Sequence, residues 1–129
     1  MTAPVPGARQ LALIRAAMLV GVLLFAGVAY ALHHQARVTP AAPLPGLQYL
    51  PLAASLLALG GIFAMRALIS STSDARRQAA FDIAGWAFGE LAAITGIVHF
   101  WFTGSTQWMA TGILIMLLSL LSLPLPAAD

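Results

Sequence analysis

The sequence predicts an all-α integral membrane protein, one domain over residues 1–129 folded as a bundle of four transmembrane helices. Hydrophobic residues make up 60% of the chain and charged residues only 8%, and the mean hydropathy is +0.91. Soluble domains have roughly a quarter charged residues, and a chain of this length cannot hide so much apolar surface from water. The apolar residues also fall into four long segments. Lipid is therefore the expected solvent for most of the chain.

The first two apolar segments cover about residues 16–32 and 47–68. Each approaches the roughly 20 residues that a helix needs to cross a hydrocarbon layer of ~30 Å. A helix satisfies its backbone hydrogen bonds within one segment, as a lipid environment requires. The connection between these segments contains Pro40, Pro43 and Pro45, which are typical of a turn between helices.

The first segment has one alternative interpretation, a cleaved signal peptide. Arg9 and Arg15, the apolar stretch and the small-residue pattern Ala29-Tyr30-Ala31 follow the order of such a peptide. Because the apolar stretch is long enough to span a bilayer, we expect a retained helix instead.

The third and fourth apolar segments cover about residues 81–103 and 108–123. The connection before the third, from Ser70 to Ala79, is rich in serine and threonine and contains Asp74, a composition that stops and caps helices. The connection between the third and fourth is only Gly104–Gln107. Such a short connection predicts an antiparallel helical hairpin.

The arginines predict the orientation of the chain. Arg37 falls on one side of the predicted membrane, and the other arginines fall on the opposite side, namely Arg9, Arg15, Arg66, Arg76 and Arg77. Because cytoplasmic loops are rich in arginine and lysine, both termini and the middle loop are predicted to be cytoplasmic, in a multi-pass protein of the bacterial inner membrane. Aromatic residues, which favour the headgroup layer, gather at the opposite helix ends: Tyr30, Tyr49, Phe100, Trp101, Phe102 and Trp108.

Glu90 is the candidate ion-binding residue. It follows Phe81 by nine residues, which places it about 13 Å into the third helix and near the bilayer midplane. Burying a carboxylate there costs on the order of 2.5–3.5 kcal/mol, so we expect Glu90 to be neutral or paired, for example hydrogen-bonded to Ser55 or Ser119. Two roles remain open: a hydrogen bond between helices worth about 1 kcal/mol, or binding and release of a proton or cation.

Gly85 and Gly89 form a GxxxG pattern that continues at helical spacing to Gly96. A stripe of such small residues lets another helix approach the backbone closely. The approaching helix is expected to belong either to the same chain or to another subunit, including a second copy of this chain.

His33, His34 and His99 are all predicted at the outer side of the membrane. Together they could ligate a metal or a haem, and His99 alone could bind a haem or pigment axially. The alternative is that they are interface histidines without a ligand and that the chain has no cofactor. Nine residues separate Glu90 from His99, about 180° around the helix, so the two are not expected to share a site. Asp82 is predicted in the first turn of its helix, paired with Arg76 or Arg77.

Residues 76–104 resemble the polar loop and carboxylate-bearing helix of the proteolipid c-type subunits of rotary F- and V-type ATPases. The resemblance implies that Arg77-Gln78 corresponds to the cytoplasmic polar loop and Glu90 to the ion-binding carboxylate. Ala79 replaces the proline usual after that loop, and only Gly60-Gly61 stands for the glycine repeat of the preceding helix. The whole chain is similar to small bacterial four-helix inner-membrane proteins with a central glutamate in their third helix.

Composition and motifs restrict the functional classes. The chain has no cysteine, its arginines are scattered, and it contains no phosphate-binding loop, nucleophile–base pair or HExxH motif, so neither an enzyme nor nucleic-acid binding is expected. The first hypothesis is an accessory or assembly subunit of a larger respiratory, photosynthetic or ATP-synthesising complex, acting through helix packing against other membrane subunits. The second is a small proton- or cation-handling protein in which Glu90 titrates within the membrane.

Overall fold

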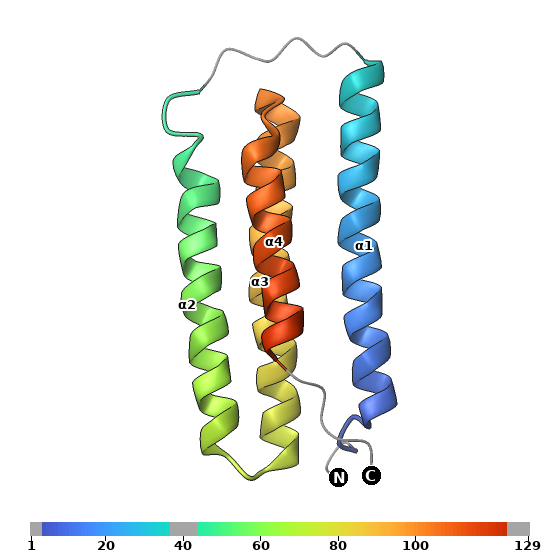
Figure 1. Cartoon of the computed structure of the whole chain (residues 1–129), viewed down its shortest axis with the longest axis vertical. Helices are drawn as coiled ribbons and strands as arrows, with labels where there is room; N and C mark the ends of the chain where they lie inside the picture. Colours follow the sequence, from blue (N-terminus) through green and yellow to red (C-terminus); the bar gives the residue numbers. More distant parts are fainter. Residues whose placement is uncertain (1–3, 37–43, 124–129) are drawn as a thin grey trace.

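The computed structural model describes residues 4–36 and 44–123, and these residues form four helices. They are α1 (Ala8–Gln35), α2 (Tyr49–Ser71), α3 (Ala75–Thr103) and α4 (Thr106–Ser122). The predicted all-α fold with four helices is therefore confirmed. α1 and α3 run in one direction and α2 and α4 in the other (Figure 1). Arg37, Pro40 and Pro43, used above, lie outside the described residues.

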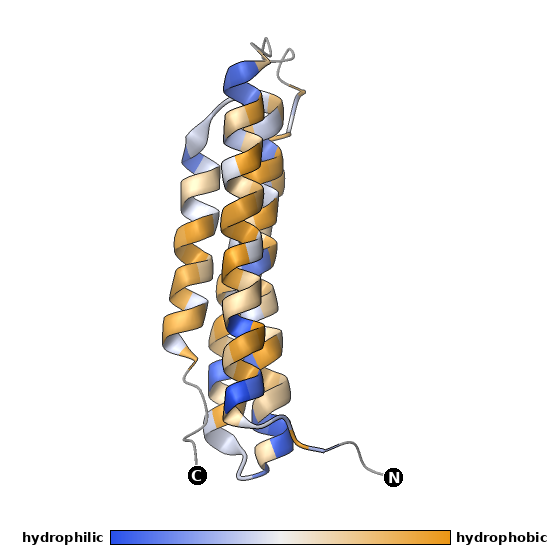
Figure 2. Cartoon of the chain, turned by 90° about the vertical axis from the view of Figure 1, so that its right-hand side faces the viewer, coloured by the Kyte–Doolittle hydropathy of each residue, from blue (hydrophilic) through white to orange (hydrophobic). Residues whose placement is uncertain are grey.

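Three of the helices, α1, α2 and α3, are long and apolar enough to cross a membrane. α4 is apolar but has only 17 residues, which gives it a length of about 26 Å. Hydrophobic residues cover the middle of the helices and hydrophilic ones gather toward the two ends (Figure 2). By helix length and composition, the chain is thus a multi-pass helical membrane protein in contact with lipid.

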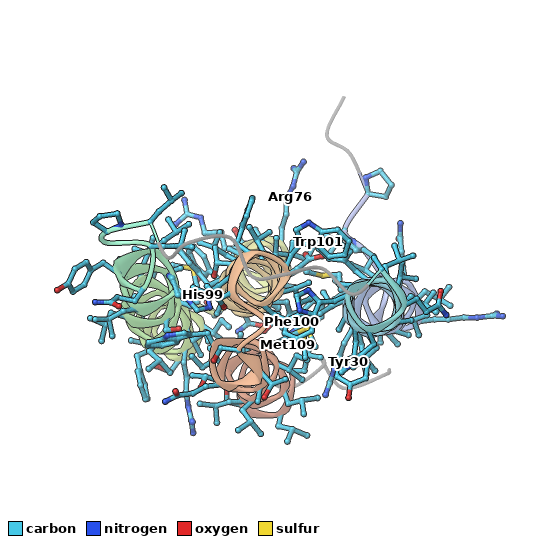
Figure 3. The ribbon with its side chains drawn as sticks, turned by 90° about the horizontal axis from the view of Figure 1, so that it is seen from above. Tyr30, Arg76, His99, Phe100, Trp101 and Met109 are labelled. Atoms are coloured by element: carbon cyan, nitrogen blue, oxygen red, sulfur yellow. The ribbon has the colours of Figure 1, made fainter. Side chains whose placement is uncertain are left out.

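α3 is the central helix of the bundle. It packs most extensively on α4, then on α2, and less on α1. Seen along the bundle, α1 and α2 lie on opposite sides of α3, with α4 beside it (Figure 3). The side chain of Arg76 points from α3 toward the side that none of the other described helices covers. α3 therefore has one open side.

α3 and α4 form the predicted antiparallel hairpin. Gly104 ends α3 with a φ of 71°, and its N–H donates to the carbonyl oxygen of Phe100 at 2.7 Å. Glycine adopts this left-handed conformation without the steric penalty of a side chain. One further residue then suffices to start α4 at Thr106.

The predicted glycine stripe of α3 lies mainly against α4. A Cβ added to Gly89 would meet Ser119 and the Cα of Met116 at 3.0 Å, and a Cβ added to Gly96 would meet the backbone of Trp108. At Gly85 an added Cβ would meet the side chain of Leu123. The close neighbour of this stripe is therefore a helix of the same chain.

Two helices begin before their apolar segments. α1 starts at Ala8 and includes Arg9 and Gln10, which are good helix formers that carry no apolar signal. α3 starts at Ala75, because Asp74 caps it: Asp74 Oδ1 accepts a hydrogen bond from the Arg76 N–H at 3.0 Å. These longer helices change the depth of every polar residue near that end of the bundle.

Candidate functional site

Asp82 is the most deeply buried acidic side chain among the described residues, with 2% of its surface exposed. Its predicted place in the first turn of the helix is wrong, because α3 begins seven residues earlier, at Ala75. The predicted pairing with Arg76 or Arg77 is wrong as well: Arg77 Nε lies 3.6 Å from Asp74 Oδ2 at the exposed helix start. Asp82 Oδ1 is buried and has no hydrogen-bond partner.

A signal for the depth of Asp82 was present in the sequence. Asp74 ends a run of serine and threonine residues, and aspartate is among the residues most favoured at a helix N-cap. Taking Asp74 as the cap places Asp82 two turns inside the helix. The apolar segment alone hid this, because Arg76, Arg77 and Gln78 interrupt it.

Trp86 follows Asp82 by one turn on the same face of α3. Its side chain is fully buried, and its Nε1 has no hydrogen-bond partner. The face therefore holds an unpaired acceptor, Asp82 Oδ1, and an unpaired donor, Trp86 Nε1, on successive turns. Leaving a buried polar group unpaired costs about 1–3 kcal/mol. We therefore expect both groups to have a hydrogen-bonding neighbour in the folded protein.

Glu90 lies one further turn along α3 and is partly exposed. Within the described residues, no hydrogen bond or ion pair joins it to Ser55 or Ser119. Ser119 instead donates to the carbonyl oxygen of Met116 at 2.7 Å, with its side chain against Gly89. Asp82, Trp86 and Glu90 therefore form a column of polar groups, four residues apart along α3, in which Asp82 and Trp86 are buried and Glu90 is partly exposed.

His33 and His34 join an aromatic cluster that links α1 to α3. The ring of His33 lies 4.9 Å from that of Phe100 and 6.4 Å from that of Trp101, and Tyr30 stacks on Phe100 at 5.9 Å. His33 Nδ1 is buried and has no hydrogen-bond partner. No local pattern indicates that α1 and α3 meet here, since the two helices are not consecutive.

His99 lies apart from this cluster, on the side of α3 that faces α2 (Figure 3). It is 7% exposed, and its Nδ1 is 3.3 Å from the hydroxyl of Thr103. Within residues 4–36 and 44–123, no group of three or more histidine or acidic side chains is arranged to hold a metal ion. His33, His34 and His99 are thus not brought together in the structure.

An apolar cavity of about 360 Å³ lies between α1 and α3 near the aromatic cluster. Its walls include Phe25 and Leu32 of α1 and Ile97 and Trp101 of α3. The lining is almost entirely hydrocarbon, and specific recognition requires a few placed polar groups. The cavity can accept an apolar chain, but its lining does not select one apolar ligand over another.

No family model matches the sequence, and no curated protein or solved structure matches it at a significant level. The chain is therefore described by its fold: a four-helix all-α protein, multi-pass by the length and composition of its helices. The resemblance of residues 76–104 to proteolipid subunits does not assign it to a family.

Proposed function

We propose that the chain is an accessory or assembly subunit of a larger bacterial inner-membrane complex of the respiratory, photosynthetic or ATP-synthesising kind. It would join this complex by helix packing, with both termini and the α2–α3 turn in the cytoplasm. The observation that carries the proposal is the position of Glu90 at the edge of the uncovered side of α3.

The open face of α3, defined here as Arg76, Ala80, Ala87, Leu91 and Ile94, is exposed along the helix. Their spacing keeps them on one side of a helix, and Arg76 points into the space that is left open by the four described helices (Figure 3). Alanines at 80 and 87 would let a partner helix approach closely.

Glu90 lies one turn from both Ala87 and Ile94, at the edge of this open face. A carboxyl group at this depth is costly in lipid and is normally directed toward protein, a cavity or a partner group. A transmembrane helix with an arginine, lysine or hydroxyl group at the same depth would satisfy it. The proposed partner is therefore a helix with a polar residue near its centre.

The experiment replaces Ile94 with a photo-crosslinking amino acid and irradiates the intact membrane. We expect a discrete adduct with another membrane protein, and loss of that adduct when Glu90→Gln is added. Leu57 on α2, which is 58% exposed, is the matched control position and should give adducts with lipid only. A chain that crosslinks only to lipid at both positions and purifies alone from mild detergent contradicts the proposal.

The alternative function is proton or cation handling with Glu90 as the titrating carboxylate. It is supported by the partial exposure of Glu90 and by the nearby unpaired carboxylate of Asp82, which together give α3 two acidic groups at different depths. A proton flux into vesicles containing the purified chain, lost in Glu90→Gln, would favour this alternative over the subunit role.

A further inference from the structure

We propose that Arg15 of α1 and Asp82 of α3 form an ion pair that locks α1 onto the rest of the bundle. The inference is independent of any partner subunit. Asp82 Oδ1 is unpaired and buried in an otherwise apolar interface, so the polar residue of α1 that faces it is the candidate partner.

The register of α1 and α3 identifies that residue as Arg15. α1 and α3 run in the same direction (Figure 1), and the rings of His33 and Phe100 are 4.9 Å apart. Arg15 precedes His33 by 18 residues, and Asp82 precedes Phe100 by the same number. Since 18 residues make about five full turns and about 27 Å, Arg15 and Asp82 lie on the facing sides of the two helices, at one level.

The helix starts give the same register. Arg15 is seven residues from the start of α1 at Ala8, and Asp82 is seven residues from the start of α3 at Ala75. Both starts lie at the same end of the bundle (Figure 1). The two charged residues are therefore matched in depth from two independent reference points.

The surrounding residues keep the helices in contact at this level. Leu11, one turn before Arg15, is fully buried and belongs to the same hydrophobic cluster as Ala79 and Trp86, which flank Asp82. Met18, about one turn after Arg15, packs against that cluster. Arg15 is itself partly buried, so one charged residue interrupts each of two apolar surfaces that face each other.

The chemistry of the two groups is complementary. A guanidinium group offers five N–H donors, and a carboxylate has about four acceptor sites, so Asp82 can accept from Arg15 and also from the unpaired indole N–H of Trp86. The described residues contain one ion pair, between Arg77 and Asp74, so pairing requires Arg15 to change rotamer. Its competing option is to extend toward the headgroup layer at the helix end.

The experiment is a double-mutant cycle with Arg15→Gln and Asp82→Asn, measured as the midpoint temperature of unfolding in mild detergent. Each single variant should lower the midpoint by several degrees, because it leaves the opposite charge buried and unpaired. The doubly neutral variant should be more stable than either single variant, and the exchange Arg15→Asp with Asp82→Arg should recover part of the loss. Arg9→Gln and Asp74→Asn, exposed charges on the same two segments, should change the midpoint little.

Two outcomes would contradict the proposed ion pair between Arg15 and Asp82. The first is additivity, with the double variant losing the sum of the two single effects, as expected if Arg15 only contacts headgroups. The second outcome applies if the single variants fail to accumulate in the membrane. The doubly neutral variant must then accumulate to a higher level than either single variant, and an equally low level of all three variants rejects the ion pair.

The register can be checked separately with Arg15→Cys and Asp82→Cys in this cysteine-free chain. A short bismaleimide, which alkylates two thiols, should bridge these two cysteines but not the pair Arg9→Cys and Asp82→Cys.

Discussion

Gly96 of α3 lies directly against the backbone of Trp108 on α4, so closely that an added Cβ would overlap the carbonyl group of Trp108. The contact is reciprocal along the hairpin, since a Cβ added to Gly112 of α4 would overlap the backbone of Ala92. In lipid, where hydrophobic burial gives helices little reason to associate, such close approach supplies the van der Waals contact that holds them together.

Replacing Gly96 with valine should therefore separate α3 from α4. The side chain has no space, because its neighbours are backbone atoms that cannot move aside, and overpacking of this kind costs typically about 1–3 kcal/mol or more. We expect a lower unfolding temperature and less folded protein in detergent, followed by size-exclusion chromatography. Gly27→Val on α1, where nothing lies within 4 Å of an added Cβ, is the control, and equal losses at both sites would contradict the packing argument.

Gly104→Ala should destabilise the turn between α3 and α4 by about 1 kcal/mol, because alanine is strained at a positive φ. Gly21→Ala, in the interior of α1 where nothing lies within 4 Å of an added Cβ, should not destabilise the chain, because alanine is the better helix former. Thermal unfolding of the two variants side by side gives the comparison. If Gly104→Ala is as stable as Gly21→Ala, the left-handed end of α3 does not constrain the hairpin.

The proposed orientation predicts which turns face the cytoplasm. Ser73 in the α2–α3 turn and Ser105 in the α3–α4 turn are both exposed, and the chain has no cysteine of its own. A membrane-impermeant maleimide should label Ser105→Cys in intact spheroplasts and Ser73→Cys only after the membrane is opened. The reverse pattern would place the termini outside the cytoplasm.

Glu90 should react with a hydrophobic carbodiimide, which modifies protonated carboxyl groups in lipid. Glu90 is the only glutamate in the chain, so the adduct can be assigned by mass spectrometry, and Glu90→Gln should remove it while leaving the protein folded in the membrane. An unreactive Glu90 at neutral pH would contradict this prediction, and is the outcome expected if a cationic residue of a partner helix pairs with the carboxyl group.

The helices and their hairpin could be predicted because their signals are local. Four apolar segments gave four helices, and Gly104 with its short connection gave the antiparallel pair α3–α4. The starts of α1 and α3 were predicted too late, since Arg9, Gln10 and Arg76 carry no apolar signal although they favour helix. The fourth apolar segment does form a helix, but α4 has only 17 residues and is shorter than the three helices that are long enough to cross a membrane.

The polar column of α3 was only partly predictable. Glu90 stands out in any apolar segment, but the burial of Asp82 depends on where α3 starts and on the approach of α1. The second of these is a contact between helices that are not consecutive, and no local pattern encodes their register. The same holds for His33, whose neighbours Phe100 and Trp101 lie more than sixty residues away in sequence.

The unequal packing of the helices implies an order of assembly. α2, α3 and α4 follow one another through short turns, and α3 packs most extensively on α4 and then on α2, so the three helices can form a compact unit soon after insertion. α1 is synthesised before α2 and α3 but packs mainly on α3, so it must wait for α3 before it can dock. Among these four helices, the one made earliest is thus the last to dock, and until then its apolar face and Arg15 are exposed to lipid.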